Sequence, residues 1–288
     1  MFLFSVSKLK KKDKYYNYKY IFFIFIVVYF WYYFIEREEN VENAILKYNL
    51  ETDGICILYN PEYTLSTTLP HTLSLTLPHT LPHTLPHTLP HTLPHTLQQD
   101  ILRELPAGYI FIDYIYKIQN SALSTFHRDV TSSQYIYKTK YPVYTAILYN
   151  YSGELLSFCP GSNKTYPFVW SRITNISGKA GTVFLFDCDI LHAGCDNNCA
   201  VKRDVLQYKI CHKDDLERLH ELSKVNVTKI EIDCKSTIWN RIMRKASYFI
   251  EMPINTFLYP LMIKRENKNN IIGRIQEYIP ISFYNNNI

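Results

Sequence analysis

The sequence predicts a mainly β fold of the sandwich or jelly-roll type, flanked by helices. Short runs rich in β-branched and aromatic residues recur along the chain, and Gly, Pro, Asn and Ser separate them. Many short strands divided by turn residues are typical of this class. The 288 residues are enough for one large domain with appendages. We expect that domain at 46–235, between an N-terminal segment at 1–45 and a C-terminal helical extension at 236–288.

The N-terminal segment combines a cluster of lysines with an apolar run. Six lysines and one aspartate lie in the first twenty residues, and the sixteen residues 20–35 carry no charge. A full span needs about twenty apolar residues, but Trp31 and Tyr32 resemble the aromatic residues of a membrane interface. We expect a single-pass anchor helix that leaves the lysines cytoplasmic and the domain lumenal. A cleaved signal peptide, a buried core helix and a cytoplasmic protein are the alternatives.

A Thr-Leu-Pro-His repeat occupies residues 68–97. Proline at every fourth position removes backbone donors, which excludes a regular helix and disfavours a sheet. We interpret the repeat as a disordered, low-complexity insertion that the domain does not need, because the entropy of closing a loop rises slowly with its length. Metal buffering by the repeated histidines is the alternative.

Regular elements are expected after the repeat. A short helix is expected at 98–105, a surface helix at 213–224, and another helix at 237–249 with Ile238 and Ile242 on one apolar stripe. We expect the last helix to pack against the strands, and a position on a membrane surface is the alternative. The expected strands are 109–116, 134–137, 143–149, 155–158, 182–186 and 201–210.

Composition narrows the possible partners. The net charge is +5, but the excess lysines are concentrated near the N-terminus and no basic stripe crosses the domain, so we expect no nucleic-acid binding.

Seven cysteines do not form a disulfide framework in a chain of this length. Cys195 and Cys199 are interpreted as free thiols, and a disulfide between them in a lumenal domain is the alternative. Four N-glycosylation sequons are compatible with a lumenal domain but are weak evidence for it, because asparagine is frequent throughout the chain.

His127 and Asp129 lie two residues apart, so their side chains leave the same face of an extended strand. With His192 from a distant strand they form the two-histidine, one-carboxylate set of non-haem Fe(II) oxygenases, which leaves coordination positions open. Arg203 follows His192 by eleven residues and is suited to clamp a carboxylate. The alternative for the ligand set is that the histidines are structural residues, with their hydrogen bonds made within the fold. The alternative for Arg203 is a surface ion pair with Asp204.

The other histidines of the chain are less suited to bind a metal. Six of the ten histidines belong to the repeat, and His212 and His220 lie in or beside a charged, solvated helix. His-Arg-Asp also opens the catalytic loop of protein kinases. However, Gln134 stands where that loop needs Asn, and no glycine-rich loop or Asp-Phe-Gly is present. The kinase interpretation is therefore excluded.

Residues from about 53 to 212, without the repeat, resemble the phytanoyl-CoA dioxygenase family of Fe(II)- and 2-oxoglutarate-dependent oxygenases, and most of all its relatives encoded by large DNA viruses. The family has a histidine where this chain has Asn163, which leaves the ligand set intact and bears on the substrate class. The resemblance is carried, in order, by a glycine followed by an apolar strand at 53–58, His-x-Asp at 127–129, turn segments at 152–155 and 159–164, a strand at 181–187 leading to the histidine segment 191–194, and Arg203.

This resemblance implies a double-stranded β-helix, the cupin-like form of the jelly roll, with a metal at one mouth. It implies that His127, Asp129 and His192 bind Fe(II), that Arg203 holds the distal carboxylate of the cosubstrate 2-oxoglutarate, and that O2 takes the last position. The expected reaction hydroxylates a small-molecule or lipid substrate and releases succinate and CO2. The alternatives are a metal-free jelly-roll binding module tethered to a membrane and a membrane-anchored structural protein.

Overall fold

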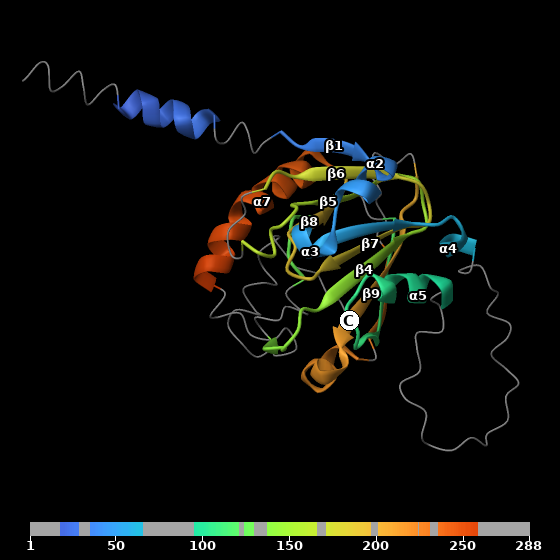
Figure 1. Cartoon of the computed structure of the whole chain (residues 1–288). Helices are drawn as coiled ribbons and strands as arrows, with labels where there is room; N and C mark the ends of the chain where they lie inside the picture. The colour runs from blue at the N-terminus through green and yellow to red at the C-terminus, as the bar shows by residue number, and fades with distance from the viewer. Residues whose placement is uncertain are drawn as a thin grey trace, which may run out of the picture. The chain divides into compact units, whose positions relative to one another are not determined.

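The computed structural model of the chain is shown in Figure 1. The chain divides into two compact units, Met1–Arg37 and Glu38–Ile288. The first unit contains a helix over residues 18–28, and the second contains the strands. The residues that the structure describes are 18–28, 35–65, 95–120, 124–129, 137–165, 171–196, 201–223, 225–230 and 236–258.

The membrane anchor that the sequence predicts at 20–35 is wrong. No helix within the described ranges is long and apolar enough to cross a membrane. The described helix at 18–28 would be roughly 16 Å long at 1.5 Å per residue, about half of the 30 Å hydrocarbon core. The described part of the uncharged run therefore gives no helix of spanning length, and the lumenal location that depended on the anchor is withdrawn. Residues 29–34 lie outside the described part.

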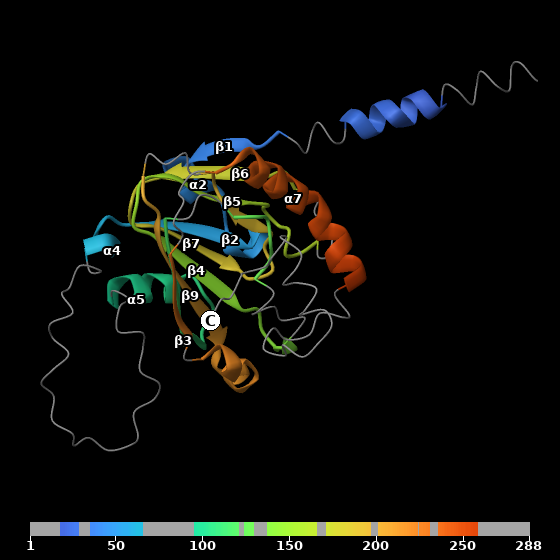
Figure 2. The ribbon, with the colours of Figure 1, turned by 180° about the vertical axis from the view of Figure 1, so that it is seen from behind.

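Most strands of the second unit form a six-stranded mixed sheet (Figures 1 and 2). All of its neighbouring strands are antiparallel except β10 and β3, which are parallel. The strand order is β10 (Val225–Ile230), β3 (Tyr109–Gln119), β9 (Asp204–His212), β4 (Tyr144–Tyr149), β7 (Thr182–Asp187) and β2 (Ile55–Tyr59).

A four-stranded sheet covers one face of the larger sheet. Its order is β1 (Arg37–Asn40), β6 (Thr174–Gly178), β5 (Gly153–Phe158) and β8 (His192–Gly194). Side chains from both sheets share one hydrophobic core, which includes Ile147, Phe184 and Phe186 from the larger sheet and Phe158 and Ile176 from the smaller. Two facing, strand-rich sheets around a common core are consistent with the predicted jelly-roll-like fold.

The other face of the six-stranded sheet is also buried. Helix α5 (His95–Arg103) places Leu97 and Ile101 against Leu148 and Leu185, and both helix residues are fully buried. Because β4 and β7 are covered on both faces, they appear in the sequence as nearly continuous apolar runs. The last residues of the predicted repeat therefore belong to the folded core, since Leu97 lies in α5; residues 66–94 lie outside the described part.

Short helices and one glycine-dependent contact accompany the sheets. Helix α3 (Leu50–Asp53) ends at Gly54, which has φ = 73°, and a Cβ at Gly54 would lie 2.5 Å from Asn163 Oδ1. Only glycine tolerates both the backbone conformation and this contact. The remaining helices are α2 (Val41–Lys47), α4 (Glu62–Leu65), the 3-10 helix η4 (Lys213–Leu222) and α7 (Ile238–Leu258).

The predicted elements agree with the structure where apolar runs are long. The expected strand at 134–137 falls mainly outside the described residues, and the surface helix expected at 213–224 is the 3-10 helix η4. Strands β6 and β10 were not predicted. Their sequences, Thr-Asn-Ile-Ser-Gly and Val-Asn-Val-Thr-Lys-Ile, contain polar and small residues, which weaken the apolar pattern.

Candidate metal centre

Backbone pairing brings the predicted ligands together. His127 and His192 form an isolated antiparallel bridge, and each N–H donates to the carbonyl of the other residue at 2.9 Å. The Asp129 N–H donates to the Cys188 carbonyl at 2.8 Å, which ties the aspartate to the turn between β7 and β8. The two histidines, which are far apart in sequence, therefore lie directly opposite each other.

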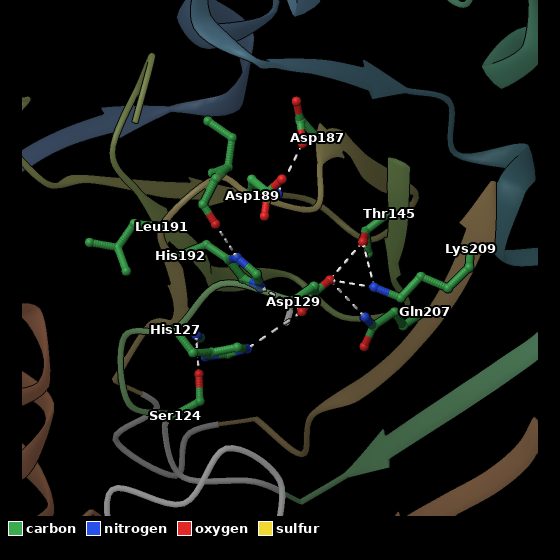
Figure 3. Close-up of polar contacts among 12 residues, drawn as sticks. Ser124, His127, Asp129, Thr145, Asp187, Asp189, Leu191, His192, Gln207 and Lys209 are labelled. Carbon is green, nitrogen blue, oxygen red and sulfur yellow. Dashed lines mark hydrogen bonds and ion pairs between the residues drawn. The ribbon is translucent and has the colours of Figure 1, made fainter. Parts of the chain in front are cut away.

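The three side chains converge on one point (Figure 3). Asp129 Oδ1 lies 3.8 Å from His127 Nε2 and 3.6 Å from His192 Nε2. His127 Nδ1 lies 2.8 Å from the Thr125 carbonyl, and His192 Nδ1 lies 3.0 Å from the Ile190 carbonyl. Since a carbonyl only accepts hydrogen bonds, each Nδ1 carries the hydrogen and each Nε2 presents a lone pair. Two imidazole lone pairs and one carboxylate oxygen fit a divalent transition metal.

The second oxygen of Asp129 is held by three donors. Asp129 Oδ2 accepts hydrogen bonds from Thr145 Oγ1 at 2.6 Å, Lys209 Nζ at 2.6 Å and Gln207 Nε2 at 3.3 Å. All four residues are buried. Burial alone would raise the pKa of Asp129, but the positive charge of Lys209, together with smaller effects of the two histidines, outweighs burial and holds that pKa well below its usual value. Asp129 is therefore ionised, with Oδ1 directed at the histidines.

The protonation state of His192 suits a metal ligand. Burial lowers the pKa of His192 to about 3, and the neighbouring His127 acts in the same direction. His192 is therefore neutral near pH 7, which is the form that binds metals.

Arg128, between two predicted ligands, lies on the opposite side of the segment. Its guanidinium Nη1 donates to the Ser162 carbonyl at 3.0 Å and to the Asp189 carbonyl. This alternation follows from extended backbone geometry, in which neighbouring side chains leave opposite faces. With 1% of its surface exposed, Arg128 is a buried link between the His127–Asp129 segment and the turn before His192.

Arg203 is buried beside the end of β8. Its Nη2 donates to the Cys195 carbonyl, whereas its Nε has no hydrogen-bond partner among the described residues. A Cβ at Gly194 would lie 2.6 Å from Arg203 Nη1, so the missing side chain of Gly194 makes room for the guanidinium. A buried cation with an unused donor fits a carboxylate ligand. The alternative of an ion pair with Asp204 is not seen, since Asp204 pairs with Lys117 at 3.5 Å.

Asn163 lies outside the ligand set. Its Nδ2 donates to Asp187 Oδ2 at 3.0 Å, and the other oxygen of Asp187 accepts from the Asp189 N–H at 2.9 Å. Asp187, Cys188 and Asp189 also lie close enough together to be considered as metal ligands. Because both Asp187 oxygens already accept hydrogen bonds, one from Asn163 and one from the Asp189 N–H, we interpret this group as structural.

The remaining predictions concern cysteines, sequons and the other histidines. Cys195 is a free, buried thiol, and Cys199 lies outside the described residues. Asn175 is buried and hydrogen-bonded to Glu38, so that sequon is not accessible in the folded chain. His212, expected to be solvated, is instead buried, with its ring 4.0 Å from that of Tyr141.

Sequence reasoning missed the residues that hold Asp129. Gln207 and Lys209 lie two residues apart in β9 and therefore share one of its faces, and Arg203 directly precedes the strand. In the strand predicted at 201–210, the spacing of these two polar residues from Arg203 puts all three on one face, which was a usable signal. Thr145 carried no comparable signal, because threonine is common in strands.

Comparisons with known proteins found only distant similarities. No family model and no curated protein matches the chain. EvdMO1 matches with 13% identity and a TM-score of 0.34 over 42% of this chain, and the match spans only 31% of EvdMO1 itself. AviO1 from Streptomyces viridochromogenes Tue57 matches with 12% identity and a TM-score of 0.37, covering 60% of this chain and 95% of AviO1.

A third match is SnoN, a non-haem, alpha-ketoglutarate-dependent epimerase from nogalamycin biosynthesis. The identity is 9% and the TM-score is 0.36, with coverage of 60% of this chain and 82% of SnoN. Identities and TM-scores this low assign no activity to the present chain.

Proposed function

We propose that this protein is an Fe(II)- and 2-oxoglutarate-dependent oxygenase that hydroxylates a small organic molecule or a lipid. The observation that carries the proposal is the convergence of two Nε2 lone pairs and one carboxylate oxygen. Three protein ligands on one side of an iron leave positions for a chelating cosubstrate and oxygen. In this interpretation the two sheets form a double-stranded β-helix of the phytanoyl-CoA dioxygenase type, with the catalytic domain at 46–235.

Each residue of the site has a defined part in this proposal. His127, Asp129 and His192 would hold the iron, and Arg203 would bind the distal carboxylate of 2-oxoglutarate through charge-assisted hydrogen bonds. The bound iron supplies oxygen activation, so that a substrate C–H bond is oxidised while 2-oxoglutarate is converted to succinate and CO2. The protein contributes ligand orientation and a dry environment, since all four side chains are buried.

The decisive experiment is an anaerobic titration of the purified protein with Fe(II) and 2-oxoglutarate. The chelate should give a weak visible charge-transfer band, and the His192→Ala variant should lose it. His220→Ala is the matched control, because His220 is exposed on η4 and should leave the band unchanged.

A positive titration should be followed by a search for the substrate. Candidate small molecules and lipids would be incubated with the iron-loaded protein, 2-oxoglutarate and oxygen, and succinate release would be measured. If the unmodified protein gives no band and takes up no divalent metal, the oxygenase proposal is wrong and a non-catalytic binding module is favoured.

A further inference from the structure

Lys209 is a buried cation in direct contact with a proposed metal ligand. It comes from the face of β9 that points towards the site, and 1% of its surface is exposed. Its Nζ lies 2.6 Å from Asp129 Oδ2 and 2.8 Å from Thr145 Oγ1. The β4–β9 register sets Thr145 opposite Lys209, so both donors reach the same carboxylate oxygen (Figure 3).

The first consequence is geometric. Asp129 Oδ2 accepts three hydrogen bonds, from Lys209, Thr145 and Gln207, whereas Oδ1 faces the two histidines. An oxygen with its lone pairs engaged in this way does not also bind a metal. Asp129 is therefore restricted to binding through Oδ1 alone, which preserves the coordination position that a bidentate carboxylate would take.

The second consequence is electrostatic. Without metal, the negative charge of Asp129 is balanced by the positive charge of Lys209. A divalent metal adds two uncompensated positive charges to a buried site, which is costly in a low dielectric. A dianionic chelating ligand then returns the total charge to its metal-free value.

From these observations, which rest on the proposed function, we infer that Lys209 couples metal binding to cosubstrate binding. The buried ammonium weakens binding of the metal alone, and this penalty disappears when the dianionic 2-oxoglutarate binds together with the metal. The two ligands therefore bind cooperatively, so that the iron is retained mainly in the ternary complex. Couplings of this kind typically change an affinity by about 5- to 150-fold.

The test measures Mn(II) affinity from the electron paramagnetic resonance signal of free Mn(II), with and without saturating 2-oxoglutarate. In the unmodified protein, 2-oxoglutarate should tighten Mn(II) binding. In Lys209→Met, Mn(II) alone should bind more tightly than in the unmodified protein, and the tightening by 2-oxoglutarate should shrink by about tenfold. A merely structural lysine would instead give weaker Mn(II) binding in the variant.

Gln207→Met is the matched control, because it removes a donor to the same oxygen without removing a charge. In this variant, the ratio of the Mn(II) affinities with and without 2-oxoglutarate should stay near that of the unmodified protein. The inference is overturned if this ratio is unchanged in Lys209→Met, or if it falls equally in both variants. Failure of the unmodified protein to bind Mn(II) or 2-oxoglutarate at all would instead count against the proposed function.

Lys209→Met leaves Asp129 buried without its counter-charge, which is strongly destabilising. The metal-free variant is therefore at risk of failing to fold. In that event Mn(II) should restore a cooperative thermal unfolding transition, because the metal replaces the missing positive charge. If Mn(II) does not restore the transition, the electrostatic role assigned to Lys209 is wrong.

Discussion

His127 and His192 are oriented by the same kind of local hydrogen bond. Each ring uses Nδ1 to donate to the carbonyl of the residue two positions earlier, Thr125 in one case and Ile190 in the other. This hydrogen bond fixes both the ring orientation and the position of the hydrogen, so each Nε2 is directed at Asp129 before any metal binds. Pre-orientation reduces the conformational entropy lost on binding.

At Arg203, a substitution should separate cosubstrate binding from metal binding. Arg203→Ala removes the buried guanidinium but none of the three proposed ligands. We expect 2-oxoglutarate affinity to fall by about 10- to 100-fold, the value of a charge-assisted hydrogen bond, with Mn(II) affinity nearly unchanged. Isothermal titration calorimetry with each ligand measures both effects. Lys202→Ala serves as the control, since Lys202 is exposed; a combined loss of both ligands in Arg203→Ala would assign Arg203 a structural role.

Among the elements, α7 contacts both segments that lie beside the proposed histidine ligands. The Phe126 N–H donates to Ser247 Oγ at 2.8 Å, directly before His127. Arg244 lies 4.6 Å from the centre of the Phe126 ring and donates to Ser157, on the strand next to β8. Helix α7 therefore supports the site from behind, in agreement with the expectation that it packs against the strands.

Removing the Ser247 hydroxyl should weaken this support. Ser247→Ala leaves the buried Phe126 N–H without its acceptor, which should lower the free energy of unfolding by about 1–3 kcal/mol. Urea denaturation measures the change. Ile242→Ala, on the exposed side of the same helix, should cost much less, because 51% of Ile242 is exposed. Equal losses in the two variants would show that the Phe126 contact is unimportant.

The repeat insertion offers a second test at the scale of elements. Its ends are held near each other, because Tyr63 after β2 donates to Asp100 of α5 at 2.7 Å. Deleting residues 68–94 should leave the melting temperature and Mn(II) binding nearly unchanged. Deleting 68–97 also removes the buried Leu97 and should cost about 2–5 kcal/mol, the usual value for losing a buried leucine side chain. Insoluble or metal-free protein from the shorter deletion would contradict the dispensability of the repeat.

For the whole molecule, the buried site predicts the pH dependence of stability. Burial lowers the pKa of His192 from 6.5 to about 3, and His127, Asp129 and Lys209 are the charged or titratable groups around it. Between these pH values the unfolded chain binds a proton that the folded chain excludes, so the free energy of unfolding falls as the pH falls. Urea denaturation of metal-free protein from pH 7 to pH 4 should show this loss. His192→Gln, which cannot take up the proton, should reduce the slope.

Local patterns predicted much of the fold and part of the site. The two-residue spacing of His127 and Asp129 and the long apolar runs of β4 and β7 are encoded within a few neighbouring residues. The partnership of Lys209 with Asp129 depends on the register between β4 and β9, and on a segment about eighty residues earlier, which no local pattern contains. The N-terminal anchor is an error of the opposite kind, because a local apolar run suggested a membrane span, whereas no helix in the described part of the chain is long and apolar enough to be one.

The pairing of Asp129 with Lys209 also bears on how the chain folds without any metal ion. The buried carboxylate already has a counter-charge from β9, so the fold does not require a metal ion to neutralise it, in contrast to small zinc domains that unfold when the metal is removed. Metal-free protein should therefore show a cooperative thermal unfolding transition and resist proteolysis.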